Sequence, residues 1–481
     1  MIRRFYGLVR RVSFRQLIDN PRAELGRVLG WAGRRLQGVA TTVAYGRPTM
    51  PAWLNDEMIA LASIEPELLG QHGGTARYRH HGLPLVTRPG EVYRQIVAAI
   101  GERRCSHVMI IPWLVRGGAD RGALYHLQAW VESMPAADVL VILTEDTASP
   151  WIGRVPAGVK VLPLGRIADG MSLDGRVQLL TRLLVQMQPS VIHTINSRVA
   201  WESFRMYGLA LRQHSRLFAS LFCDDEDENG VPVGYARSYL RNCAHYLSGV
   251  FCDNSVYPGK WSLELGVCRS LFTVLPFPYD RAAELKDDEF AIDSRARVLW
   301  AGRFHRQKRP DILLAIAREM PDVCFDVHGV SELGSPHPAV DELRRLPNVM
   351  LRSPFSRFED VATPHHAAYL FTSSWEGLPT ILLDAAAAGV PIVAPAVGGI
   401  VDFIDRAWLI DEPDDVAGFV ERLRQLLSDP ALRRSRRREQ YDALLVGRGW
   451  ADFIGILGCV EDYLPELQQE PKSMSRQGSA K

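Results

Sequence analysis

The stretch from Phe371 to Gly399 constrains the fold of this chain more than any other part of its sequence. The apolar residues 369–372 predict a strand, and the alanine-rich segment that begins near Thr380 favours a helix. Gly389 is placed to end that helix, and the following apolar run is typical of a buried parallel strand. Strand, helix and strand form a βαβ unit, whose ligand-binding edge lies where the first strand passes to the helix.

The turn at this edge predicts the kind of ligand. Free N–H groups at the start of a helix bind phosphate. The carboxylates of Glu376, in the turn, and Asp384, in the helix, accept hydrogen bonds from hydroxyl groups. A phosphate site next to hydroxyl acceptors suggests a sugar nucleotide.

Composition sets the outer limits of the prediction. The chain has 481 residues, enough for about three domains. Its net charge of +1, with 23% charged residues, gives no reason to expect a nucleic-acid partner. The 7 scattered cysteines lack metal-ligand spacing, so we expect reduced thiols and a cytoplasmic protein. No apolar run approaches the ~18 residues of a membrane span, and arginines interrupt the first apolar stretch, so we expect neither a spanning helix nor a signal peptide.

We assign residues 1–104 to a helical, basic N-terminal extension, in which residues 91–100 form one helix. Nine arginines precede residue 38, where only Asp19 and Glu24 oppose them, and apolar residues recur at near-helical spacing. Two interpretations stay open for residues 1–38. They dock on an anionic membrane face, or they pack on the catalytic domain with their arginines in solvent.

A Rossmann-like N-terminal domain is predicted over residues 105–276. It opens with the strand 107–112 and a turn that contains Gly117 and Gly118, followed by a helix. The glycines let a ligand approach the start of this helix, although the turn lacks the full GxGxxG pattern of an NAD site. Further strands, among them residues 139–143 and 249–252, alternate with helices as in a doubly wound parallel sheet.

A second Rossmann-like domain is predicted over residues 277–446. Its first strand, residues 297–301, leads into a basic loop, and a short strand at residues 409–410 is expected to complete its sheet. We assign residues 447–470 to a crossover helix and 471–481 to a disordered tail. Two such domains would face each other across a cleft, with the C-terminal strand ends of both sheets on it.

The motif residues of the second domain resemble those of the retaining family 4 glycosyltransferases, which have the two-lobed GT-B fold. In chain order they are Gly302, Arg303, Lys308, Glu376, Gly377, Leu378, Pro379 and Asp384. The similarity in organisation covers residues 105–465. The blocks PWLVRGGAD and SRLFASLFCDDEDENG are also similar to bacterial members that assemble cell-surface polysaccharides.

The resemblance implies a role for each motif residue. Arg303 and Lys308 would stabilise the leaving diphosphate as two cations, so neither a metal ion nor a cofactor is expected. Glu376 would bind hydroxyls of the donor sugar, and Asp384 stands where the family usually has a ribose-binding Glu. The other donor-binding residues are Gly302, Gly377, Leu378, Pro379 and Thr380. Each role has an alternative. Arg303 and Lys308 could belong to a solvated basic loop, Glu376 could cap the helix, and Asp384 could be an ordinary exposed helix residue.

The acceptor side is expected on the first lobe. Gly117 and Gly118 match the family's glycine pair near the phosphate and the acceptor. Many members have a histidine in a cleft loop after a first-lobe strand, where this chain reads Phe222-Cys223-Asp224-Asp225, and Asp224 is our candidate contact for an acceptor hydroxyl. The acidic run 225–230 begins like a calcium loop, but its twelfth position is alanine rather than glutamate, so we expect no metal there.

The sequence therefore predicts a metal-independent, retaining glycosyltransferase. It would move a hexose from a nucleotide diphosphate sugar to a glycan or lipid-linked acceptor in the synthesis of a surface polysaccharide such as lipopolysaccharide. Two alternatives stay open: a nucleotide-sugar epimerase of the same fold, and a catalytically silent binding subunit. The donor base, the sugar and the linkage do not follow from these residues.

Overall fold

The structure of the protein is a computed structural model. It describes residues 52–65, 88–101, 104–279, 297–330, 337–355, 357–363 and 365–465. The chain divides into two compact units, Met1–Glu91 and Val92–Lys481. The first unit contains helix α4 (Ala52–Ala62). The predictions for residues 1–38 and 471–481 lie outside the described residues. Among the helices that are described, none is long and apolar enough to cross a membrane.

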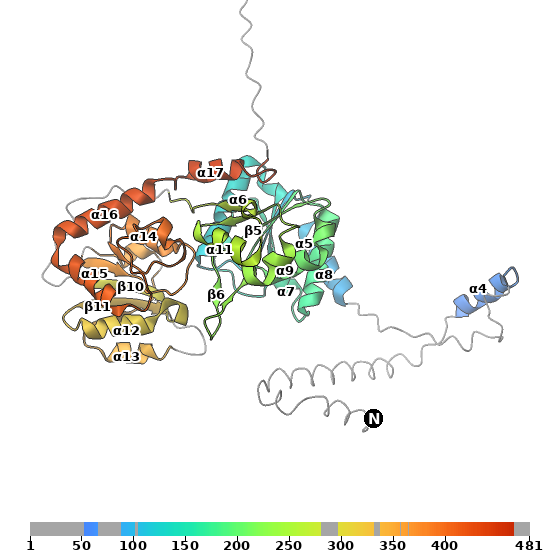
Figure 1. The fold of residues 1–481 in the computed structure, drawn as a ribbon. Helices are drawn as coiled ribbons and strands as arrows, with labels where there is room; N and C mark the ends of the chain where they lie inside the picture. Colours follow the sequence, from blue (N-terminus) through green and yellow to red (C-terminus); the bar gives the residue numbers. More distant parts are fainter. Residues whose placement is uncertain are drawn as a thin grey trace, which may run out of the picture. The chain divides into compact units, whose positions relative to one another are not determined.

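The first lobe of the second unit is built on a parallel sheet of order β3-β2-β1-β4-β5-β8-β9 (Figure 1). The strands are β1 (His107–Ile111), β2 (Val139–Leu143), β3 (Lys160–Leu162), β4 (Val191–Ile195), β5 (Arg216–Ser220), β8 (Gly249–Cys252) and β9 (Phe272–Val274). They are short and almost wholly buried, as expected for a sheet covered on both faces. The strand order reverses between β1 and β4, which is where an open α/β sheet forms its ligand crevice.

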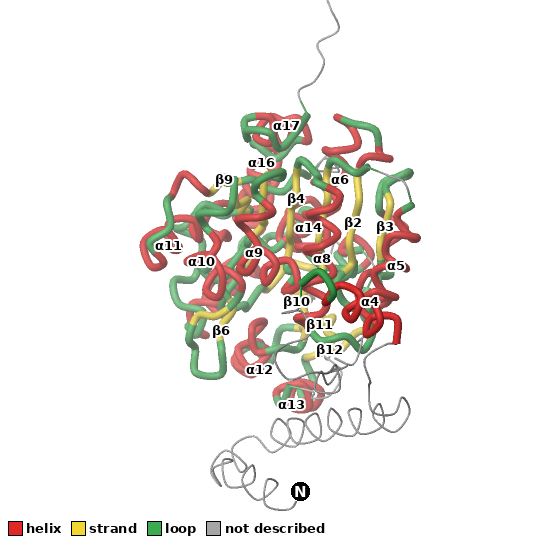
Figure 2. The backbone as a smooth tube through the Cα atoms, turned by 90° about the vertical axis from the view of Figure 1, so that its right-hand side faces the viewer, coloured by secondary structure: helices red, strands yellow, loops and turns green. Residues whose placement is uncertain are grey.

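Helices cover both faces of this sheet (Figure 2). They are α5 (Arg88–Ile100), α6 (Gly118–Ser133), α7 (Leu164–Ile167), α8 (Leu173–Met187), α9 (Arg198–Leu211), α10 (Arg241–Cys243) and α11 (Val256–Leu265), with a π-helical turn at Ala236–Leu240. Ile96 and Ile100 of α5 are buried in the same core as β1. The structure therefore corrects the extension drawn at residues 1–104, because its last helix belongs to the first lobe.

The second lobe carries a parallel sheet of order β12-β11-β10-β13-β14. Its strands are β10 (Arg297–Arg303), β11 (Cys324–Val330), β12 (Val349–Arg352), β13 (His366–Leu370) and β14 (Ile392–Val393). Its helices are α12 (Pro310–Glu319), α13 (Ala339–Arg345), α14 (Thr380–Ala387), α15 (Val416–Ser428) and α16 (Pro430–Leu445). The βαβ unit predicted at the outset is formed by β13, α14 and β14. Two doubly wound α/β lobes are present, as predicted.

The end of the described chain returns to the first lobe. Helix α17 (Trp450–Gly458) lies beside α6 in Figure 1, and the Trp450 Nε1–H donates to Glu132 on α6 at 2.7 Å. Phe453, Leu457 and Tyr463 are buried in the core on this face of the first sheet. The chain thus returns from the second lobe to the first at this helix, which ends at Gly458, before the assigned limit of residue 470.

Candidate functional site

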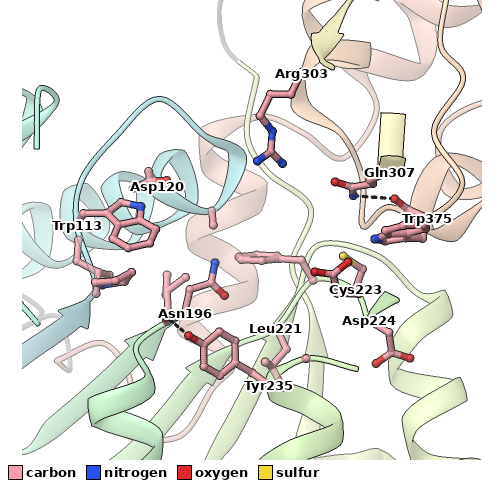
Figure 3. A pocket seen from close by; sticks show the side chains of 17 residues that line it. Trp113, Asp120, Asn196, Leu221, Cys223, Asp224, Tyr235, Arg303, Gln307 and Trp375 are labelled. Carbon is pink, nitrogen blue, oxygen red and sulfur yellow. Dashed lines mark hydrogen bonds between the residues drawn. The ribbon is translucent and has the colours of Figure 1, made fainter. Parts of the chain in front are cut away.

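A cavity of about 530 Å³ lies between the two lobes, at the C-terminal ends of strands from both sheets (Figure 3). Its volume is within the usual range of ligand pockets. Its first-lobe wall follows β1, β4 and β5, at the point where the strand order reverses. Its second-lobe wall comes from the loop after β10 and the turn before α14. Figure 3 shows Arg303 extending from the second lobe toward Asn196 and Trp113 on the first.

Lys308 and Glu376 form an ion pair on the second lobe. Lys308 ends a short helical turn (Arg306–Lys308), and its backbone carbonyl accepts the Thr372 hydroxyl at 2.6 Å. Glu376 is only 9% exposed. The structure therefore brings together Lys308 and Glu376, 68 residues apart in sequence. A shielded cation and a shielded carboxylate meet beside the cavity that Arg303 lines.

The starts of helices α6 and α14 face each other across the lobes. A Cβ atom added to Gly118 would lie 3.7 Å from Cγ2 of Thr380, the first residue of α14. Gly117 directly precedes α6, and a Cβ atom on it would meet Asp120 of the same helix at 2.8 Å. Both helix ends carry partial positive charge, and an anion between them would be stabilised.

The turn before α14 is held from the first lobe by Asp253. The Leu378 N–H donates to Oδ2 of Asp253 at 3.0 Å, and a Cβ atom on Gly377 would lie 2.9 Å from Oδ1. The Leu378 amide, expected to face the sugar or the phosphate, is thus already bonded to a carboxyl group. Ser255 makes a second contact between the lobes, because its N–H and hydroxyl donate to Asp402 at 2.6 and 2.7 Å.

Asp253 predicts a pH-dependent stability. Burial raises its pKa to about 7, so the carboxyl group is neutral in the folded protein at mildly acidic pH. The folded pKa exceeds the unfolded value of about 3.9, so protonation of Asp253 stabilises the folded state. This contribution to the free energy of unfolding is complete below pH ~4 and is lost as pH rises through 7. Asp253→Asn is neutral at every pH, and its amide oxygen still accepts from Leu378. We expect it to exceed wild type by about 1–4 kcal/mol at pH 8.

Urea denaturation at pH 8 and pH 5 measures this difference. The stabilisation by Asp253→Asn should shrink at pH 5, where the wild-type carboxyl group is protonated. Asp402→Asn is the matched control, because that carboxylate is exposed and also joins the lobes. Equal stability of Asp253→Asn and wild type at pH 8 would contradict the raised pKa of Asp253.

Asp384 lies at the interface between the lobes and is already bonded to the first lobe. Both of its oxygens lie 3.4 Å from the guanidinium of Arg121 on α6, and the Tyr279 hydroxyl donates to Oδ1 at 3.3 Å. The group lines a second interlobe cavity of about 320 Å³, which Arg116 and Arg154 also line. The ribose contact stays a prediction, and a ribose at this position must share the carboxylate with Arg121.

Asp224 is not available as predicted. Its side chain is 3% exposed and forms an ion pair with Arg237 at 2.6 Å. It also accepts the Trp261 Nε1–H at 2.7 Å, and Lys260 lies 3.6 Å away. Figure 3 shows the Asp224 carboxylate turned away from Asn196 and Arg303. Asp224 therefore lines the cavity but its oxygens serve the first lobe, which corrects its role as a contact for an acceptor hydroxyl.

Cys223 lies in the first-lobe loop 222–225 and lines the cavity. Its pKa is raised well above the ordinary value by burial and by the nearby carboxylates of Glu376 and Asp253. The thiol is therefore protonated at neutral pH and cannot act as a general base. Among the described residues, no group of three His, Cys, Asp or Glu side chains is placed to hold a metal ion.

Sequence reasoning missed several residues that line the cavity: Trp113, Asn196, Tyr235, Gln307 and Trp375. Gln307 fixes the turn of the βαβ unit, because its side-chain amide donates to the Trp375 carbonyl at 2.9 Å. Asn196 has a positive φ of 54° directly after β4. The signal in the sequence that could have identified Asn196 is its position directly after a buried strand, because ligands bind at the strand ends where the strand order reverses.

Residues 295–429 match the family described as "Glycosyl transferases group 1". This range includes Arg303, Lys308, Glu376 and Asp384. A D-inositol 3-phosphate glycosyltransferase of Mycobacterium sp. (strain KMS) is 38% identical over 132 residues, which is 26% of this chain and 29% of the relative. The chain thus matches less than a third of that relative's length.

Solved structures resemble a larger part of the chain. The lipopolysaccharide outer core galactosyltransferase WaaB has a TM-score of 0.53 at 16% identity, over 73% of this chain and 99% of that one. Anabaena HepE in complex with UDP has a TM-score of 0.55 at 15% identity, over 73% and 98%. This likeness shows the fold, and the GT-B architecture predicted from the sequence is confirmed.

Proposed function

We propose that the protein is a metal-independent, retaining glycosyltransferase that uses a nucleotide diphosphate sugar. The observation that carries the proposal is the shielded Lys308–Glu376 ion pair beside an interlobe cavity lined by Arg303. All three residues lie in the segment that matches the glycosyl transferase family. The HepE structure contains UDP, so we take uridine nucleotides as the first donors to test.

The proposed reaction begins with the donor diphosphate between the two helix starts. Arg303 and Lys308 take up the negative charge that develops as the bond between the anomeric carbon and the diphosphate breaks. Glu376 accepts hydrogen bonds from hydroxyls of the hexose and thereby orients the anomeric carbon. The acceptor hydroxyl attacks from the face that the diphosphate leaves, which retains the anomeric configuration. The proton of the acceptor hydroxyl passes to the departing diphosphate oxygen, since the Cys223 thiol is already protonated and cannot take it.

The acceptor in this proposal is a glycan or a lipid-linked glycan of a surface polysaccharide, and the reaction takes place in the cytoplasm. WaaB, one of the structural neighbours, is named for the lipopolysaccharide outer core. All 7 cysteines are free, as suits a reducing compartment. Peripheral membrane contact through residues 1–38 is a separate proposal, tested by comparing the full chain and a chain without them on anionic vesicles.

Release of nucleotide diphosphate tests the activity. The full chain is incubated with UDP-glucose, UDP-galactose or UDP-N-acetylglucosamine, with and without a panel of methyl glycosides, and with and without EDTA. We expect acceptor-dependent release of UDP, unaffected by EDTA, and a product whose anomeric configuration, determined by NMR, matches the donor. Conversion of the nucleotide sugar without acceptor would instead favour an epimerase, and UDP binding without turnover would favour a silent subunit.

A further inference from the structure

The first-lobe half of the interlobe cavity carries carboxylates and no cation among its described lining residues. Its charged side chains are Asp120, Asp224 and Asp225. Asp224 is neutralised by Arg237, whereas Asp225 is exposed and its Oδ1 accepts its neighbour's N–H at 2.9 Å. The cation that lines the cavity is Arg303, from the second lobe. The proposed function already assigns Arg303 to the donor diphosphate.

This charge pattern disfavours an anionic acceptor. A phosphate group needs fixed donors or cations to replace its water, and Arg or Lys side chains commonly supply them. A phosphorylated sugar in this half would instead lie next to carboxylates, without a cation of its own. Neutral hydroxyl groups carry no such penalty. Carboxylates accept hydrogen bonds from them, and side-chain amides can both donate and accept.

Asn196 supplies a polar group that suits a hydroxyl. Figure 3 shows its side chain directed into the cavity between Tyr235 and Arg303. Within the part of the chain that the structure describes, no hydrogen bond uses its side-chain amide. The amide can both donate and accept, as a hydroxyl can.

The backbone holds Asn196 in this position. Its φ of 54° is left-handed, a conformation that asparagine tolerates better than most residues. Its carbonyl accepts the Tyr235 hydroxyl at 2.7 Å. The next residue, Ser197, caps helix α9 by accepting the Ala200 N–H at 3.2 Å. Strained residues of this kind cluster where a side chain must be aimed at a ligand.

Aromatic side chains supply the apolar part of the same wall. Trp113, in the loop after β1, is 37% exposed although it lines a cavity, and Tyr235 lines the same side of that cavity (Figure 3). An aromatic ring offers a flat apolar surface with little conformational freedom to lose on binding. A sugar ring has both features that this wall recognises, an apolar face and hydroxyl groups at its edge.

We propose that the first-lobe half of the cavity is a subsite for an uncharged sugar ring of the acceptor. Asn196 bonds one hydroxyl of that ring, Trp113 lies against its face, and a phosphate on the same ring is excluded. This inference rests on the proposed function for the role of Arg303. It separates the chain from the Mycobacterium relative, whose name specifies a phosphorylated acceptor.

Saturation-transfer NMR on the full chain with saturating UDP tests the subsite. The probes are the methyl glycosides of glucose, galactose, mannose and N-acetylglucosamine, each with its 6-phosphate. We expect at least one neutral glycoside to bind and its 6-phosphate to bind at least about tenfold more weakly. Equal or tighter binding of the 6-phosphate would overturn the proposal, and so would the absence of binding by every neutral glycoside.

Asn196→Gly is the decisive variant, because glycine adopts the left-handed conformation without strain and removes only the amide. We expect about a tenfold loss of neutral glycoside affinity, as for one lost hydrogen bond, with UDP affinity and melting temperature unchanged. Asn229→Gly is the matched control, since Asn229 is exposed and outside the cavity. Unchanged glycoside binding in Asn196→Gly would refute the role of Asn196. A chain that binds glycosides but neither UDP nor a UDP-sugar would refute the proposed function and leave the subsite standing.

Discussion

Replacing Lys308 with alanine is expected to lower the turnover of nucleotide sugar by about 10²–10³-fold. The Lys308 side chain is only 17% exposed, so its charge acts on the leaving diphosphate with little screening by water. The substitution also leaves the shielded Glu376 carboxylate without its cation, which disturbs the group that orients the sugar. Steady-state release of UDP measures the effect, and we expect kcat to fall more than KM rises.

The paired variant Glu376→Gln keeps the shape of the side chain and removes its charge. It should lower kcat as well, because an amide accepts hydrogen bonds from sugar hydroxyls less strongly than a carboxylate does. Arg318→Ala is the control, since it removes an exposed cation of the same lobe that pairs with Glu342 away from the cavity. Wild-type kcat in both Lys308→Ala and Glu376→Gln would refute the assignment of the donor site.

The fold was largely predictable because buried parallel strands are short, continuous apolar runs. Strands β2 and β8 occupy the residues expected for them, 139–143 and 249–252. Helix α16 is harder to predict, because arginines occupy part of its buried face in place of apolar residues. In the structure Arg433 and Arg437 are buried, and Arg433 donates to the last carbonyls of α15. An arginine that is buried because it donates to the end of another helix produces no apolar periodicity in its own helix.

The minor strands escaped prediction for a different reason. The hairpin of β6 (Asp225–Glu226) and β7 (Pro232–Val233) has two residues in each strand. Asp227 holds its turn by accepting the N–H groups of Asn229 and Val231 at 2.9 Å, and Arg306 of the second lobe adds a contact to the Asp227 carbonyl. The predicted strand at Leu409–Ile410 likewise proves to be one bridge between Ile410 and Pro395. Such short pairings depend on tertiary position more than on local preference.

The site was predictable where strand ends dictate it. Arg303 ends β10, and Glu376 follows β13, its neighbour in the sheet, so both side chains emerge at one edge. Contacts from the other lobe were not predictable. Arg121 meets Asp384 across 263 residues, and Asp253 meets Leu378 across 125. No local sequence pattern predicts which first-lobe side chain will form a hydrogen bond with a given group of the second lobe.

Replacing Tyr463 with phenylalanine is expected to destabilise the first lobe by about 2–5 kcal/mol. The Tyr463 hydroxyl lies 2.7 Å from Nδ1 of both His126 and His193, and all three side chains are buried. The hydroxyl donates to one ring nitrogen and accepts from the other. Phenylalanine keeps the packing but leaves both nitrogens in an apolar core without this partner, and each such loss costs about 1–3 kcal/mol.

Urea denaturation at pH 8 measures the effect of Tyr463→Phe. The half-buried Tyr207 on α9 provides the control, and Tyr207→Phe should change the unfolding midpoint little. A Tyr463→Phe protein as stable as wild type would mean that the two histidines find other partners. The variant should also keep its turnover in the folded state, because Tyr463 lies in the core behind the first sheet and not at the interlobe cavity.

These two histidines and the buried His107 make the folded protein sensitive to acid. Burial lowers the pKa of His107 to about 4, that of His126 to about 3, and that of His193 well below its ordinary value. These folded values lie below the unfolded value of about 6.5, so the neutral rings favour the folded state. Their contribution to the free energy of unfolding is complete above pH 6.5 and is lost as pH falls toward the folded pKa values.

Asp253 acts in the opposite direction, since its folded pKa of about 7 makes protonation favour the folded state over the same interval. Three rings outweigh one carboxyl group, so wild-type stability in urea should decrease from pH 6.5 to pH 5. In Asp253→Asn the opposing contribution is absent, and the decrease should be steeper. A wild-type protein that becomes more stable over this interval would show that the histidine rings take up protons without unfolding the core.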